Sequence, residues 1–453
     1  MFHLAMQRII TTAFFLLYAT TAIAQGYRGR DFWVCFPENA AIEGNKTLHL
    51  SLFITAEART KGTIVNMLDS SRRSFSVETD ASTEVDIDTE IEIRSSELAE
   101  SKSLHITSDH DITLYVVSHR PASTDSYAAI PTSLLGTHYM AAGYTMLQNG
   151  PEAFTSQAAT IATEDNTLVT VHLTATIGDG IWHAHSKGQT AIIPLNRGQT
   201  FQIQGAEIYT DNDLTGTAFT SDKPVAFFTG HRCATIPSGY SFCDMLLEME
   251  PPEIDWGREF ILAKFQEKDF YVARVIAASD STDVSIDGQH AATLASGAFY
   301  EIDTLHNDAL LTTSKPALVA QYATSSNADS VKVGDPFMLF VIPSDRFIRT
   351  VTTASVTVGA FRHFLNIVLP TAALPSLRLD GLRVNAKNSL RWMKPVRENI
   401  APGGSYSILT FEAPEGRHLL QCSAPMAVYS YGFGERGSNY DSYGHACGMR
   451  LGK

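Results

Sequence analysis

Positive charge is scarce in this sequence. Its 453 residues include 34 Lys and Arg against 48 Asp and Glu, so the formal net charge is −14 at pH 7. Binding to nucleic acid requires clustered Lys and Arg that neutralise phosphates, and docking on an anionic membrane surface requires similar clusters. The acidic balance therefore argues against nucleic acid and against a membrane surface as partners.

The motifs of catalysis and cofactor binding are missing as well. The sequence contains no nucleophile elbow, no Walker loop, no dinucleotide-binding fingerprint and no His-Glu-x-x-His metal motif. Because a catalytic triad is assembled in space, this absence alone does not exclude an enzyme. It favours a protein that is not an enzyme and that carries no cofactor and no metal, with a glycan-active hydrolase as an alternative.

Long apolar runs are confined to the N-terminus. Arg8 precedes an apolar stretch over residues 9–18, and Ala22-Ile23-Ala24 fits a cleavage site before Gln25. This pattern predicts a signal peptide over residues 1–24 and a mature protein that is secreted or displayed at the cell surface. We expect no membrane span, because no second apolar run is long enough.

Cysteines are few. Cys233 and Cys243 would close a short loop in an oxidising compartment, so we predict a disulfide between them. Cys35 and Cys447 lie near the two ends of the mature chain and could pair if the first and last strands are neighbours. Cys422 would then be the odd cysteine, buried and inert.

The sequence also lacks a long helix, and short strands separated by turn residues take its place. The clearest repeat is a short turn followed by an apolar strand, and its four copies read SDHDITLYVVSHR, SDKPVAFFTGHR, TSKPALVAQYAT and CSAPMAVYSYGF. The turn position is occupied by Asp111, Pro224, Pro316 and Pro425. The start of each copy is marked by an aromatic residue after a short polar segment, at Phe32, Tyr139, Phe260 and Phe347.

Each copy offers about seven or eight strands, which predicts an all-β protein of about four tandem β-sandwich-like modules packed against one another. The predicted modules cover residues 25–134, 135–254, 255–343 and 344–453, and the second contains the Cys233–Cys243 loop. The alternative is a propeller-like ring, in which each copy is an enlarged blade and the termini meet.

Acidic residues alternate with apolar ones from Glu84 to Ile93. If this run is one strand, a single face carries Glu84, Asp86, Asp88, Glu90 and Glu92. Carboxylates in a row can bind calcium, but this row lacks the loop that wraps oxygen atoms round the ion. We therefore predict a solvated strand face that prevents edge pairing.

Three residues are candidates for contact with a partner. His231 and Arg232 end the repeated strand of the second copy, as His119 and Arg120 do in the first, and could form a polar rim. Trp256 follows a proline pair and could be a binding anchor. The competing interpretations are a hydrogen-bonded strand end for the His-Arg pairs and packing between modules for Trp256.

The sequence reads SDKPVAFFTGHRC from Ser221 and CDMLLEMEPPEIDWGREF from Cys243 to Phe260, and this stretch resembles the N-terminal domain of the IgG Fc-binding protein family. The family pattern combines a Lys-Pro-Val-Ala strand, a Gly-x-x-Cys, a Cys-Asp and a proline segment that ends in Trp-Gly and an aromatic residue. The matching residues are Lys223, Pro224, Gly230, Cys233, Cys243, Asp244, Pro251, Trp256, Gly257 and Phe260. The ending of the chain, with Asp441, Ser442, Tyr443 and Gly444, also resembles the close of that domain.

The resemblance implies an extracellular, disulfide-bonded recognition domain. Large animal members carry cysteine-rich regions after this domain, whereas this chain has only five cysteines, so mucin-like cross-linking is not implied. We expect a secreted recognition or adhesion protein whose partner is a protein or glycoprotein, such as immunoglobulin Fc or a mucin. A self-associating component of the cell envelope is the structural alternative.

Overall fold

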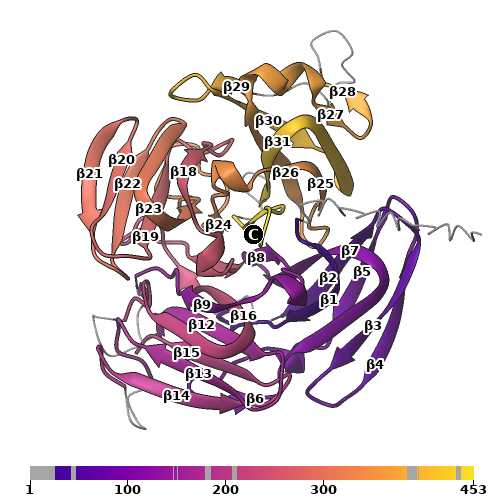
Figure 1. Cartoon of the computed structure of the whole chain (residues 1–453), viewed down its shortest axis with the longest axis vertical. Coiled ribbons are helices and arrows are strands. Elements are labelled where there is room, and N and C mark those ends of the chain that lie inside the picture. The colour runs from indigo at the N-terminus through magenta and orange to yellow at the C-terminus, as the bar shows by residue number, and fades with distance from the viewer. Residues whose placement is uncertain are drawn as a thin grey trace, which may run out of the picture.

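The computed structural model describes residues 26–41, 47–145, 147–149, 152–178, 185–206, 212–384, 395, 397–434 and 440–452. The predicted signal peptide, residues 1–24, lies outside the described residues. The described chain is almost entirely β-structure, arranged as four modules round a common centre in chain order (Figure 1). No helix among the described residues is long and apolar enough to cross a membrane.

Each module is built on the same seven antiparallel strands. Module 1 contains β1 (Arg28–Val34), β2 (His49–Ala56), β3 (Thr60–Asn66), β4 (Arg72–Val77), β5 (Ala81–Ile87), β7 (Leu104–Arg120) and β8 (Ser123–Ala128). Module 2 contains β9 (Gly136–Met140), β12 (Ser156–Ala162), β13 (Thr167–His172), β14 (Thr190–Leu195), β15 (Thr200–Gln204), β16 (Ala218–Ala234) and β17 (Asp244–Met249).

The other two modules repeat this order. Module 3 contains β18 (Gly257–Leu262), β19 (Tyr271–Ala277), β20 (Thr282–Ile286), β21 (Gln289–Leu294), β22 (Phe299–Leu305), β23 (Ala309–Tyr322) and β24 (Met338–Phe340). Module 4 contains β25 (Ile348–Ala354), β26 (Phe361–Pro370), β27 (Arg378–Leu379), β28 (Leu382–Arg383), β30 (Tyr406–Ala413), β31 (Arg417–Gly434) and β32 (Ser442–Ala446).

Short elements complete the fold. The additional strands are β6 (Ala99–Glu100), β10 (Leu147–Asn149), β11 (Glu152–Phe154) and β29 (Arg397–Ile400). The helices are single turns or little more: η1 (Thr89–Ile91), η2 (Thr132–Leu134), η3 (Glu253–Asp255), η4 (Ser344–Arg346) and η5 (Thr371–Ser376). β6 lies between β5 and β7 of module 1 in the chain but pairs with β15 of module 2, so it ties module 1 to module 2.

One long strand organises every module. In module 2 the first half of β16 pairs with β9 and β13, and its second half pairs with β12 and β17. The strands β7, β23 and β31 divide their partners in the same way. The seven common strands of each module therefore form two four-stranded sheets that share one long strand, which confirms the predicted all-β, sandwich-like modules.

The repeated proline position is not a turn, and that part of the sequence interpretation was wrong. Pro224, Pro316 and Pro425 lie inside the long strands, as Asp111 does in β7. At this position every long strand shifts register against the first strand of its module. Because proline cannot donate to a sheet ladder, a bulge is one of the few strand sites that tolerates it.

The register also corrects the start of the fourth copy. In module 1 the marker residue Phe32 pairs with Ile106 of the long strand. The equivalent pair in module 4 is Val351 with Leu420. The aromatic residue expected to mark this start, Phe347, instead precedes β25, in the connection that follows η4. The sequence alignment of the fourth copy was therefore four residues out of step.

The modules close into a ring through their last strands. β8, β17, β24 and β32 are the inner strands and contact one another round the centre. The buried carboxylate of Asp125 in β8 accepts hydrogen bonds from the backbone N–H groups of Leu247 (2.8 Å), Gly444 (3.2 Å) and Met338 (3.4 Å). One side chain thus contacts all three other modules.

The ends of the described chain meet where the ring closes. Tyr115 in module 1 donates its hydroxyl to the carbonyl of Thr352 in module 4 at 2.6 Å. Arg450 N–H donates to the carbonyl of Arg346 at 2.8 Å, so the C-terminal segment lies across the connection between modules 3 and 4. The largest buried cluster includes residues from all four modules. The sandwich-like modules thus also form the ring that was the alternative arrangement.

Candidate recognition surface at the centre of the ring

The loops that join the sixth and seventh strands gather at one end of the central axis. In module 1 this loop is a two-residue hairpin, whereas residues 235–243 form it in module 2 and residues 323–337 in module 3. The backbone N–H of Ser325 donates to the carbonyl of Ile236 at 2.7 Å, which joins the loops of modules 2 and 3. Thr124 donates to Asp441 at 2.7 Å, which joins modules 1 and 4.

A disulfide closes the loop of module 2. Cys233 and Cys243 are bonded, with a Cα–Cα distance of 5.1 Å, as the sequence predicted. Both are buried, in a small cluster with Ala40 and Phe154. The cross-link fixes the base of the loop, so the residues between the two cysteines are presented at the centre of the ring.

Exposed aromatic side chains gather on this loop and beside it. Phe242 is 54% exposed and stacks on Tyr440, which is 38% exposed, with a ring separation of 5.9 Å. Tyr240, two residues before Phe242, is 42% exposed. These three are the only strongly exposed Phe, Tyr or Trp side chains among the described residues. We call Tyr240, Phe242 and Tyr440 the aromatic patch.

The structure beneath the aromatic patch is acidic and buried. Burial raises the pKa of Asp244, which directly follows the disulfide, and the carboxylates of Asp441 and Asp335 raise it further. Burial also raises the pKa of Asp335, to about 7. Lys268 lies nearby and donates to the carbonyls of Thr324 (2.6 Å), Val333 (2.6 Å) and Gly334 (2.8 Å). The lysine therefore holds the module 3 loop in one shape.

His231 and Arg232 lie at the end of β16, below the aromatic patch. His231 is fully buried, its Nδ1 accepts from the N–H of Cys233 at 3.0 Å, and burial lowers its pKa to about 3. Arg232 is half-buried and pairs with Glu38 at 3.0 Å. Arg120 in module 1 is placed in the same way and pairs with Glu92. These are the contacts of hydrogen-bonded strand ends.

Trp256 lies between modules 2 and 3 and is only 4% exposed. Its indole N–H donates to the carbonyl of Pro251 at 3.2 Å, and its cluster includes Met140 of module 2 and Val272 of module 3. This is the arrangement of a packing residue.

The other cysteines are free thiols in separate places. Cys35 belongs to the large central core, whereas Cys447 belongs to the core of module 4 and donates to Thr353 Oγ1 at 3.3 Å. The suggested Cys35–Cys447 disulfide is therefore not formed, because meeting termini do not bring the two thiols together. Cys422 is free and buried, as expected.

A basic cavity of about 530 Å³ lies on module 4. No carboxylate lines it among the described residues; its lining is Arg349, Thr350, Ser376, Arg378, Arg383, Gln421, Cys422 and Ser423. Strand register places Arg378 directly opposite both Gln421 and Arg383. Like charges that face each other across strands are destabilising, so an anion bound between the two guanidinium groups would be stabilised.

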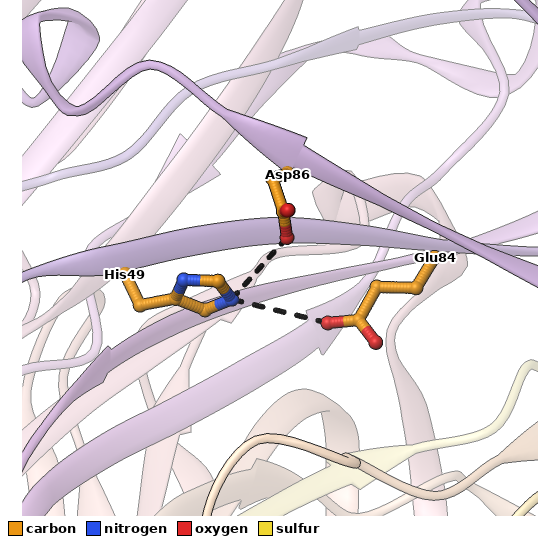
Figure 2. A group of neighbouring side chains, drawn as sticks. All are labelled: His49, Glu84 and Asp86. Carbon is orange, nitrogen blue, oxygen red and sulfur yellow. Dashed lines mark ion pairs between the residues drawn. The ribbon is translucent and has the colours of Figure 1, made fainter.

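The acidic run after Glu84 is only partly a strand face. β5 ends at Ile87, Asp88 caps η1 by accepting from the N–H of Glu90 at 3.1 Å, and Glu92 is buried. The five carboxylates are therefore not one solvated face, because the backbone turns after Ile87. Glu84 and Asp86 do share a face, and His49 of the neighbouring strand lies between them and offers a third metal-ligand atom (Figure 2).

Two comparisons with known proteins give the same result. Residues 125–432 match the family model described as IgGFc binding protein. The chain is also 21% identical over 414 residues to a protein of Homo sapiens named IgGFc-binding protein. That alignment covers 89% of this chain but 7% of the human protein, so the chain spans less than a tenth of that relative's length.

Proposed function

The chain belongs to the IgGFc binding protein family, and from this membership we propose that it is a secreted recognition protein whose aromatic patch binds a protein or glycoprotein partner. The observation that carries the proposal is the gathering of Tyr240, Phe242 and Tyr440 at the centre of the ring. Tyr and Trp are enriched, with Arg, among the residues that contribute most to binding energy, and Phe is enriched in interface cores.

The patch has the rigidity that a binding site needs. Its loop is closed by the Cys233–Cys243 bond and is hydrogen-bonded to the module 3 loop through Ser325. A side chain that is already fixed loses little conformational entropy when a partner binds. The disulfide also agrees with an oxidising, extracellular location.

The basic cavity supports a glycoprotein as the partner. Arg378 and Arg383 present guanidinium groups beside the hydroxyls of Ser376 and Ser423. Arginine binds carboxylate and phosphate-like groups through paired N–H donors, so acidic sugars would be held there. Immunoglobulin Fc and mucins are the first partners to test, since the human relative is named for Fc binding.

The test is capture of these partners by the mature full-length chain. Immobilised wild-type protein would be exposed to purified Fc and to mucin, beside a variant that combines Tyr240→Ser, Phe242→Ser and Tyr440→Ser. We expect the variant to bind at least ~10-fold more weakly, because each hot-spot aromatic contributes about 2 kcal/mol or more. A control with Leu168→Ser and Ile192→Ser, two exposed apolar residues of module 2, should bind normally.

Two results would contradict the proposal. Retention of neither Fc nor mucin by the wild-type chain would remove its main support, and equal binding by the patch variant would assign recognition to another surface. A defined oligomer on a sizing column, disrupted by the same variant, would instead favour the self-associating envelope component.

A further inference from the structure

A histidine and two carboxylates converge on the neighbouring strands β2 and β5 of module 1. His49 lies at the start of β2, and Glu84 and Asp86 lie in β5. The Nε2 atom of His49 is 3.4 Å from Asp86 Oδ1 and 3.9 Å from Glu84 Oε1 (Figure 2). All three ligand atoms lie within 4.8 Å of one another.

Strand register explains why these residues meet. β2 and β5 are antiparallel neighbours in which Ser51 is paired with Asp86 and Phe53 with Glu84. Residues two apart in a strand share a face, so His49 lies on the same face as Ser51 and diagonally across from Asp86. The cluster therefore follows from the sheet itself and does not depend on a loop.

From this geometry we propose that His49, Glu84 and Asp86 bind a divalent transition-metal ion, with Zn²⁺ as the best fit. Zn²⁺ bonds to imidazole nitrogen and carboxylate oxygen are about 2.0–2.2 Å long, so two tetrahedral ligand atoms lie about 3.4 Å apart. The His49–Asp86 separation already has this value, whereas the Glu84 oxygen, which is 3.9 Å from His49 Nε2, must move closer to complete the tetrahedron.

The donor set distinguishes among metals. Ca²⁺ takes six to eight oxygen ligands and Mg²⁺ prefers an octahedron of oxygens, so neither suits a site with an imidazole nitrogen. Imidazole with carboxylates suits Zn²⁺ and its transition-metal neighbours. Three protein ligands leave a fourth position for water, and this position is open because Asp86 is 73% exposed.

A fourth side chain on the same face gives independent support. Ser51 lies between His49 and Phe53 in β2 and directly opposite Asp86. It is fully buried, and its Oγ has no hydrogen-bond partner among the residues that the structure describes. A buried hydroxyl without a partner is costly, and a water molecule bound to the ion would supply the missing hydrogen bond.

The site also lies where the ring closes. The second carboxylate oxygen of Glu84 accepts from Thr357 Oγ1 of module 4 at 2.7 Å. An ion bound by Glu84 would thus be connected to the last module through that hydrogen bond, and such outer contacts orient metal ligands. We infer that Zn²⁺ stabilises the contact between the first and last modules.

The experiment is titration of the chelator-treated, full-length mature protein with Zn²⁺ by calorimetry, with Ca²⁺ and Mg²⁺ in parallel. The variants are His49→Gln, Glu84→Gln and Asp86→Asn, and the matched control is His172→Gln, an exposed histidine whose ring nitrogen contacts only Thr190 in the described structure. We expect one Zn²⁺ site per chain, at least 10-fold weaker in each ligand variant and unchanged in the control, with no comparable Ca²⁺ or Mg²⁺ binding.

Thermal unfolding provides the second measurement. Zn²⁺ should raise the Tm of the wild-type chain and of His172→Gln but not of Asp86→Asn, whose exposed position keeps the variant folded. Absence of Zn²⁺ binding by the wild-type chain would overturn the proposal and leave a plain ion pair. Equal Zn²⁺ affinity in the three ligand variants would overturn it too, by placing the ion elsewhere.

Discussion

The carboxylate of Asp125 accepts a hydrogen bond from the backbone N–H of Gly444, 319 residues later in the chain. The same carboxylate accepts from Leu247 and Met338, so four modules meet at one buried side chain. Burial raises the pKa of Asp125 well above its ordinary value, and the N–H donors, which favour the charged form, offset only part of this rise. The ring is thus joined at its centre by a polar contact.

Asp125→Asn should destabilise the whole ring. The amide would direct its NH₂ group at one set of backbone donors and leave buried N–H groups without partners, each at a cost of about 1–3 kcal/mol. We expect a loss of about 3 kcal/mol or more in the free energy of unfolding, measured by denaturant titration. Asp303→Asn, at an exposed position of β22, is the control and should change stability by less than ~0.5 kcal/mol; equal losses would show that Asp125 has no special role.

Gly257→Ala should loosen the connection between modules 3 and 4. A Cβ on Gly257 would lie 2.1 Å from Cβ of Pro343, the residue that precedes η4. Overpacking of this kind costs about 1–3 kcal/mol. Thermal unfolding should show a lower Tm, whereas Arg258→Ala, at the exposed next position of β18, is the control and should leave the Tm almost unchanged. The prediction fails if both variants lose the same stability.

Removal of the disulfide should weaken partner binding more than it destabilises the ring. The bond closes a loop with a sequence separation of 10, for which the loss of chain entropy in the unfolded state corresponds to about 2–3 kcal/mol. We expect the double variant Cys233→Ser, Cys243→Ser to unfold at a lower temperature and to lose partner capture, because the aromatic patch is no longer held. Cys422→Ser, which alters a free thiol, is the control. Full capture by the double variant would show that the bond does not order the patch.

His363 should make the protein acid-sensitive. Burial lowers the pKa of His363 to about 4, against about 6.5 in the unfolded chain. Between these two pKa values the unfolded state binds more protons than the folded state. The contribution of neutral His363 to the free energy of unfolding is therefore complete above pH 6.5 and is lost as the pH falls towards 4. Denaturant titrations at pH 7.5, 5.5 and 4.5 should therefore show a smaller loss in His363→Gln than in the wild-type chain. Parallel losses would rule out His363 as a source of the acid sensitivity.

The modules were predictable because their strands repeat in sequence. The long strand carries a recognisable segment in each copy, and Cys233 and Cys243 are close enough to suggest their own pairing. The sequence does not distinguish a proline in a turn from a proline at a bulge inside a strand. The structure does, because β16 pairs with β13 before Pro224 and with β12 after it.

The contacts across the ring were not predictable. Nothing local marks Asp125 as a partner of Gly444, since the contact depends on how four modules are packed. The acidic alternation did indicate Glu84 and Asp86, but His49 is supplied by a neighbouring strand whose register the sequence does not state. The aromatic patch joins Phe242 to Tyr440 across almost 200 residues for the same reason.

The hydrogen bonds of Asp125 have a consequence for biosynthesis. A ribosome releases the segment with Asp125 long before it adds Gly444, so the first module emerges with a carboxylate whose later partners do not yet exist. The growing chain therefore cannot mature one module at a time from its N-terminus. A gene product truncated after the third module would retain an unsatisfied centre and should be recognised by quality control as incomplete.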